Sequence, residues 1–292
     1  MGERAEPVLA VPAPRTSLRA GPRHALGIRR VSPEPDLAAS AASDRLFFAR
    51  LEAEALAHPA LNHPWLRAVE KGGYANMDQT LRDFARQYHA YSNAFPRYLK
   101  QVIRKLQQPG HRALLAENLS EEEGYLGESD RVKLRSVGID PAGVDGVAHR
   151  QLYRRFCLSL GIRDEELERP SPFAIEWRDD LLGFLDTASP AAALGALGLG
   201  TEYVVKPFYG AISTGIRSLD LAQLIDRRFF DIHCALDDQH ADDLRSVSLS
   251  FASNPRDRSE MRTGMLHALG LRARFLTQLD HQAQVASGGR AS

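Results

Sequence analysis

The chain of 292 residues is 43% hydrophobic and 25% charged, and its 37 basic residues balance 37 acidic ones. This composition fits one or two globular domains with a sizeable core. A formal net charge of zero argues against nucleic-acid binding, which requires a basic face. The two cysteines, Cys157 and Cys234, lie in partly apolar helical patterns and predict reduced thiols in a cytoplasmic protein. The sequence shows neither an apolar run of about 18 residues, as a membrane span requires, nor a secretory signal.

Residues 1–43 differ in composition from the rest of the chain. Prolines and alanines alternate with arginines, and few large apolar residues interrupt them. Such a stretch buries too little apolar surface to offset the entropy lost on ordering, so we expect a disordered tail. Residues 286–292 are expected to form a second, short tail. One helical domain is therefore predicted over residues 44–285.

The segment between the tails has helical patterns throughout. Asp44 can cap a first helix over 45–57. Apolar and aromatic side chains recur at steps of three, four and seven residues over 77–108, which predicts a long helix that Pro96 should kink. Further helices are expected over 111–124, 148–160, 173–186, 190–215, 219–247 and 255–283. No alternating strand pattern and no fixed repeat is present, so the predicted fold class is all-α, a bundle of seven or eight helices.

One of these helices carries residue types that bind metals. Its sequence contains the spacing His233-x-x-x-Asp237-x-x-His240. An α-helix turns by about 100° per residue, so these three side chains project within roughly 60° of one another. Two imidazoles and a carboxylate on one face make half of a metal site of mixed nitrogen and oxygen type. The alternative is a chance alignment of structural residues.

Three other segments offer further ligands. Glu202 is the only carboxylate in the apolar helix predicted over 190–215. There it must be bound to a metal, protonated or paired, for example with a buried arginine. The glutamates at 121–123 precede a glycine, but such a run is normally a solvated face. His149 opens an amphipathic helix, where a histidine is more often structural than a ligand.

Taken together, these segments resemble the heme-oxygenase-like di-iron oxidases and oxygenases. These iron-containing redox enzymes belong to the superfamily that also holds thiaminase II and pyrroloquinoline-quinone synthase. The resemblance covers residues 45–284. It rests on four segments in the family order, which are Asn118-Leu-x-Glu-Glu122-x-Gly124, Ala148-His149-x-x-Leu-Tyr-x-x-Phe156, a solitary Glu202 and His233-x-x-x-Asp237-x-x-His240. The segment between Glu122 and His149 is longer than we expect for compact members.

The resemblance implies a heme-oxygenase-like bundle with a non-haem site for two Fe²⁺ ions. The implied ligands are Glu122, His149, Glu202, His233, Asp237 and His240. Among Glu121, Glu122 and Glu123, the register of the motif favours Glu122. Because neighbours on a helix point about 100° apart, only one of the three is expected to face the core. Carboxylates and imidazoles without a thiolate suit iron or manganese rather than structural zinc.

By the same resemblance, the chain is an iron-dependent oxidoreductase that uses dioxygen to oxidise a small amphipathic substrate of amino-acid or fatty-acid type. Tyr88, Tyr203 and Lys206 are candidate catalytic residues. The tyrosines, with Tyr91, are otherwise core aromatics with hydrogen-bonded hydroxyls, and the stem of Lys206 can extend to solvent. Two alternatives stay open: a metal-free enzyme of the superfamily, thiaminase-like or a cofactorless oxidase, and a non-enzymatic helical interaction protein. The oligomeric state, a homodimer included, stays open too.

Overall fold

The computed structural model describes the backbone of residues 35–288, and the side chains of residues 42–286 except 237 and 238. Within residues 35–288 every regular element is a helix, which confirms the all-α prediction for this part of the chain. No helix there is both long and apolar enough to cross a membrane. The predicted domain boundaries fall inside helices, because α1 (Pro35–Ala57) begins before residue 44 and α13 (Pro255–Gly288) continues past residue 285.

Two of the long predicted helices are shorter or divided. The helix predicted over 77–108 is a pair, α3 (Met77–Asn93) and α4 (Phe95–Lys105), which meet at Ala94. Pro96 lies in the first turn of α4, where a missing N–H costs no intrahelical hydrogen bond, so it starts a helix instead of kinking one. The helix predicted from residue 219 begins later, as α12 (Arg228–Leu249).

The other helices match predicted ranges or add short segments between them. These short additions raise the number of segments above the predicted seven or eight without changing the fold class. The remaining α-helices are α2 (Pro64–Glu70), α5 (Pro109–Glu122), α6 (Glu128–Ser136), α7 (His149–Ser159), α8 (Asp164–Leu167), α9 (Pro172–Thr187), α10 (Pro190–Leu194) and α11 (Tyr203–Arg217).

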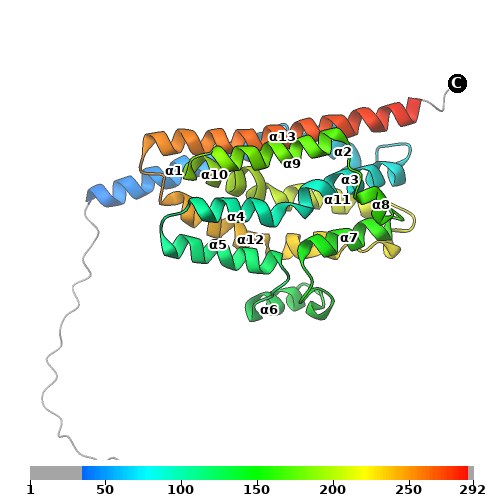
Figure 1. Ribbon diagram of the computed structural model, residues 1–292, viewed down its shortest axis with the longest axis horizontal. Coiled ribbons are helices and arrows are strands. Elements are labelled where there is room, and N and C mark those ends of the chain that lie inside the picture. Colours follow the sequence, from blue (N-terminus) through cyan, green and yellow to red (C-terminus); the bar gives the residue numbers. More distant parts are fainter. Residues whose placement is uncertain (1–34, 289–292) are drawn as a thin grey trace, which may run out of the picture.

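The long helices run side by side in a bundle (Figure 1). The C-terminal helix α13 extends along one edge and packs on α9 and α10, while α12 packs on α11 and α5. Helix α6 projects from the opposite edge of the bundle (Figure 1). It belongs to the long segment between Glu122 and His149, so this additional length forms a protrusion and leaves the bundle intact.

Between α10 and α11 the chain widens into a π-helical segment, η2 (Gly195–Glu202), which is buried along its whole length. It packs on α13 with backbone touching backbone. A Cβ atom at Gly195 would lie 1.9 Å from the carbonyl oxygen of Met261, and one at Gly264 would lie 1.8 Å from that of Ala192. Only glycine permits this approach. The last residue of this tightly packed segment is Glu202.

Candidate metal centre

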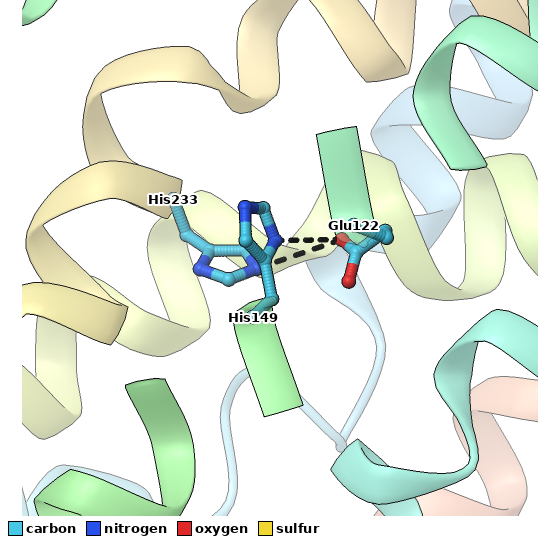
Figure 2. Close-up of side chains that lie close together, drawn as sticks. All are labelled: Glu122, His149 and His233. Carbon is cyan, nitrogen blue, oxygen red and sulfur yellow. Dashed lines mark ion pairs between the residues drawn. The ribbon is translucent and has the colours of Figure 1, made fainter. Parts of the chain in front are cut away.

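Three predicted ligands converge in the middle of the bundle: Glu122, His149 and His233 (Figure 2). All three side chains are buried, and their ligand atoms lie within 4.8 Å of one another. The Oε1 atom of Glu122 lies 3.0 Å from Nδ1 of His149 and 3.9 Å from Nε2 of His233. One carboxylate therefore faces two imidazoles that come from different helices.

A glycine explains why Glu122 and His149 meet across a long insertion. Glu122 ends α5, and Gly124 then adopts a positive φ of 103°. A Cβ atom at Gly124 would lie 2.7 Å from the carbonyl carbon of Val147, so only glycine lets these two segments of the chain touch. The Gly146 N–H also donates to the Gly124 carbonyl at 2.8 Å. The end of α5 is thus held against the start of α7, where His149 is the first residue.

The ring of His233 is oriented by its own helix. Its Nδ1 lies 2.6 Å from the carbonyl oxygen of Phe229, one turn earlier on α12. A carbonyl only accepts hydrogen bonds, so Nδ1 carries the proton and the lone pair of Nε2 is directed toward Glu122. Burial and, less strongly, the nearby His149 lower the pKa of His233 to about 3, against the opposing effect of Glu122. A neutral imidazole with an available Nε2 is the form that binds metals.

The carboxyl group of Glu122 is held in its charged form. Burial by itself raises its pKa, but the interactions with His149, His233 and His240 outweigh burial and lower the pKa to about 2. An ionised carboxylate beside imidazoles is a suitable ligand set for a divalent cation.

A second acid–histidine pair lies farther along α12. Nε2 of the buried His240 is 2.6 Å from Oε2 of Glu121, whose side chain is only 18% exposed. Of the three glutamates only Glu122 is buried, and Glu121 is half-buried but still reaches a buried histidine. The end of α5 lies between α7 and α12, so side chains about 100° apart still meet buried partners. Only Glu123 points outward, where it pairs with Arg150.

Glu202 is buried near both acid–histidine clusters. Burial raises its pKa to about 7, and the charges that act on it include those of His240, Glu122 and Glu121. Its Oε1 atom has no hydrogen-bond partner among the described residues. A buried carboxylate oxygen without a partner, close to further carboxylates and imidazoles, fits a bound metal ion well. The side chain of Asp237 is outside the described part of the chain.

The candidate catalytic residues lie in different places. The hydroxyl of Tyr88 is buried and hydrogen-bonded to that of Tyr209 at 2.8 Å. Tyr203 and the exposed Lys206 instead line an outer pocket, and Glu202 also lines this pocket. None of these three predicted residues borders the inner cavity beside Glu122 and His233.

The inner cavity is small, with a volume of about 20 Å³. Its walls include Glu122, Glu202 and His233 together with aromatic side chains. Tyr91 and Tyr209 are the tyrosines that line it. The sequence held a signal for Tyr209, because it lies seven residues after Glu202 and hence on nearly the same helix face.

The arrangement of helices is the heme-oxygenase-like fold. A CADD-like protein of unknown function from Nostoc punctiforme matches with a TM-score of 0.64 and 16% identity, over 83% of this chain and 99% of its own. A TenA homolog from Pseudomonas syringae pv. tomato matches with a TM-score of 0.60 and 14% identity, over 83% and 93%. A domain with a heme oxygenase-like fold from Shewanella denitrificans gives 0.57 and 16%, over 89% and 97%. At these identities the likeness shows the fold alone.

Sequence comparison defines the family. The model of a family described as iron-containing redox enzymes matches residues 82–273, more than half of the chain, so the chain belongs to this family. The resemblance noted from the motifs is thereby confirmed. A 4-aminobenzoate synthase from Chlamydia muridarum (strain MoPn / Nigg) is 28% identical over 113 residues. That match spans 38% of this chain and 38% of the relative.

Proposed function

We propose that this iron-containing redox enzyme is a non-haem di-iron oxidase or oxygenase, which uses dioxygen to oxidise a small amphipathic substrate. One observation carries the proposal. Two acid–histidine clusters, Glu122 with His149 and His233, and Glu121 with His240, lie near the buried carboxyl group of Glu202, whose Oε1 has no hydrogen-bond partner among the described residues. Family membership supports the choice of iron.

The first cluster would hold one ion through Glu122, His149 and His233. Glu121 and His240 would hold a second, and Glu202 with the predicted ligand Asp237 would complete the set. Bound there, ferrous iron supplies the electrons and the open coordination positions that dioxygen activation requires.

The surrounding residues prepare the site for this chemistry. The Phe229 carbonyl keeps His233 in the tautomer that ligates through Nε2. Phe95, Val205 and Phe229 line the cavity and limit the entry of water. The hydroxyls of Tyr91 and Tyr209 add polar points beside these apolar side chains. Such a mixture of apolar and polar walls is consistent with a small amphipathic substrate.

Metal content tests the proposal directly. We expect about two iron ions per chain after anaerobic reconstitution with Fe²⁺, measured by elemental analysis of desalted protein. His233→Ala, Glu122→Gln and Glu121→Gln should each lose at least one ion, because each removes a ligand of one cluster. Glu123→Gln is the matched control, since its side chain pairs with Arg150 at the surface, and it should retain both.

Three results would contradict this assignment in whole or in part. Full iron retention in His233→Ala and Glu122→Gln would refute the first cluster. Wild-type protein that binds no iron would favour the metal-free enzyme of the same superfamily. Retention of both ions in Glu121→Gln alone would return the ligand set to the one predicted from the motif.

A further inference from the structure

The inner cavity beside Glu122 and His233 is too small for the body of an organic molecule. Its volume of about 20 Å³ is only a little more than the roughly 10–15 Å³ that a single water molecule requires. Dioxygen, or one small group of a substrate, is the most that fits there. Pockets that bind organic ligands usually enclose roughly 300–1,000 Å³. The rest of a substrate therefore needs a second space that reaches the same residues.

The outer pocket lined by Tyr203 and Lys206 has the required size. Its volume is about 590 Å³, and its walls come from α1, from the junction of η2 with α11 and from α12. Glu202 lines this pocket as well as the inner cavity. A molecule in the outer pocket therefore meets the candidate metal centre at Glu202.

Glu202 forms the inner end of the outer pocket. It is 4% exposed, and its Oε1 has no hydrogen-bond partner among the described residues. Lys206, Pro207 and Asp242 are exposed, so they form the mouth. A pocket that runs from solvent to a buried carboxylate without a partner has the form of a binding site rather than of a shallow surface groove.

The charges on the α1 side of the pocket do not balance. The side chain of Glu52 is 15% exposed, and its Oε1 lies 3.1 Å from Nε of Arg245 on α12. Burial raises the pKa of Glu52, Arg245 lowers it, and the carboxylate of Asp242 raises it again. Two carboxylates thus act here against one guanidinium. One further positive charge would balance this group.

We propose that the outer pocket binds the organic substrate, and that this substrate carries a primary ammonium group held by Glu52 and Asp242. This inference rests on the proposed function, because it concerns the molecule that is oxidised at the metal centre. An ammonium group donates three hydrogen bonds and so can pair with two carboxylates at once. The substrate class is an amine with an apolar body. It differs from both types that the resemblance implies, because it requires no carboxylate.

Apolar groups on the remaining walls suit the body of such a molecule. Leu56, Pro207, Ala241 and the ring of Tyr203 line the pocket between its mouth and Glu202. The far end of the substrate reaches Glu202, while dioxygen fits in the inner cavity. The two reactants thereby occupy separate spaces that share one carboxylate.

The competing role for the outer pocket is the entry of Fe²⁺ toward Glu202. Carboxylates at the mouth attract any cation. The charged groups of Lys206 and Arg245 line the same pocket, however, and they repel a divalent ion twice as strongly as a monovalent one. An amine also fills the apolar part of the pocket, which an ion does not. The composition of the walls therefore favours the amine.

Calorimetric titration of the iron-loaded protein without oxygen tests the proposal, with hexylamine as the probe and hexanol and hexanoate as ligands of equal chain length. Wild-type protein should bind hexylamine at least tenfold more tightly than either, which exceeds the roughly fivefold that an exposed ion pair gives. Glu52→Gln should weaken hexylamine binding at least tenfold and Asp242→Asn several-fold, with hexanol binding unchanged. Asp220→Asn is the control, since this exposed aspartate lies outside the pocket, and it should bind like wild type.

No preference for hexylamine, or equal hexylamine affinity in wild type and both pocket variants, would overturn the proposal. Slower Fe²⁺ uptake by Asp242→Asn with unchanged hexylamine binding would also overturn it and assign the pocket to iron entry. If Glu52→Gln does not fold, the exposed Asp242 decides the outcome alone. Iron content is measured on the same samples. Wild-type protein without iron refutes the proposed function, whereas two bound ions without a preference for hexylamine refute only this inference.

Discussion

Glu121 and Glu122 show how adjacent residues at a helix end can serve different partners. His233 and His240 are seven residues apart, so they lie about 10 Å apart along α12. Glu122, at the last position of α5, contacts His233 together with His149. Glu121 contacts His240 instead. Two histidine positions two turns apart therefore match two consecutive carboxylates, and this correspondence depends on how α5 crosses α12.

His63 is a residue whose protonation state bears on stability. It precedes α2, where its Nδ1 accepts a hydrogen bond from the Trp65 N–H at 3.2 Å. Its Nε2 is 3.1 Å from the hydroxyl oxygen of Thr277 on α13. Burial lowers the pKa of His63 below its usual 6.5, although Asp280 opposes the shift. Protonation of Nδ1 would remove the acceptor that caps α2.

Acidification should therefore destabilise the protein through His63. In the pH range between the lowered pKa of the folded protein and 6.5, the unfolded chain binds more protons than the folded protein. The free energy of unfolding therefore rises with pH across this range, and the stabilisation due to neutral His63 is complete above about pH 6.5. His63→Asn keeps a capping acceptor that does not titrate. Urea unfolding between pH 7.5 and 5.5 should show wild type losing up to about 1 kcal/mol relative to this variant. Parallel pH profiles for the two proteins would exclude this role of His63.

At the scale of elements, the contact between η2 and α13 positions Glu202. Gly195 and Gly264 allow the two backbones to touch, and a Cβ atom at Gly200 would lie 2.7 Å from Cβ of Ala268. A π-helical turn also adds a residue to the helix, which changes the face that following side chains occupy. The direction of the Glu202 carboxylate is thus set by packing on α13 as well as by its own helix.

We expect Gly264→Ala to destabilise the protein by on the order of 3 kcal/mol, because the new methyl group meets the Ala192 carbonyl and neither helix backbone can yield locally. Gly183→Ala is the matched control. Gly183 lies within α9, and a Cβ atom there meets nothing within 4 Å, so alanine should stabilise by about 0.5–1 kcal/mol. Chemical denaturation measures both changes. Wild-type stability in Gly264→Ala would show that the helices separate at little cost.

At the scale of the whole molecule, the candidate site joins segments that are distant in sequence. Its described ligand candidates come from α5, α7, η2 and α12, which pack around the middle of the bundle (Figure 1). The unfolded chain cannot present them together. A metal ion bound by all of them would therefore bind the folded state selectively and stabilise the bundle as a unit.

Iron should accordingly raise the free energy of unfolding. At a free Fe²⁺ concentration about 100 times the dissociation constant, the gain is about 2.7 kcal/mol by mass action. Removing iron with a chelator should reverse the gain, and Glu122→Gln should show little of it, whereas Glu123→Gln should behave like wild type. Anaerobic denaturant unfolding with and without Fe²⁺ measures these differences. An unchanged transition in wild type would mean that the folded bundle does not bind iron selectively.

Much of this protein was predictable from local pattern. Apolar side chains at helical spacing predicted most of the helices, because an α-helix buries one face whatever it packs against. The run from His233 to His240 predicted ligands on one helix face, since the angle between side chains depends only on helix geometry. The insertion after Glu122 was also visible, although its structure as a protruding α6 was not.

Contacts between elements depended on the packing of the bundle. The pairing of Glu121 with His240, the cavity wall formed by Tyr209 and the burial of Arg272 each involve segments far apart in the chain. Whether a side chain meets a buried partner or solvent depends on the neighbouring helix and its crossing angle. The sequence by itself therefore determined the helices and one face of the site. Only the tertiary structure decided which acids meet which histidines, because that depends on distances between helices that local periodicity does not encode.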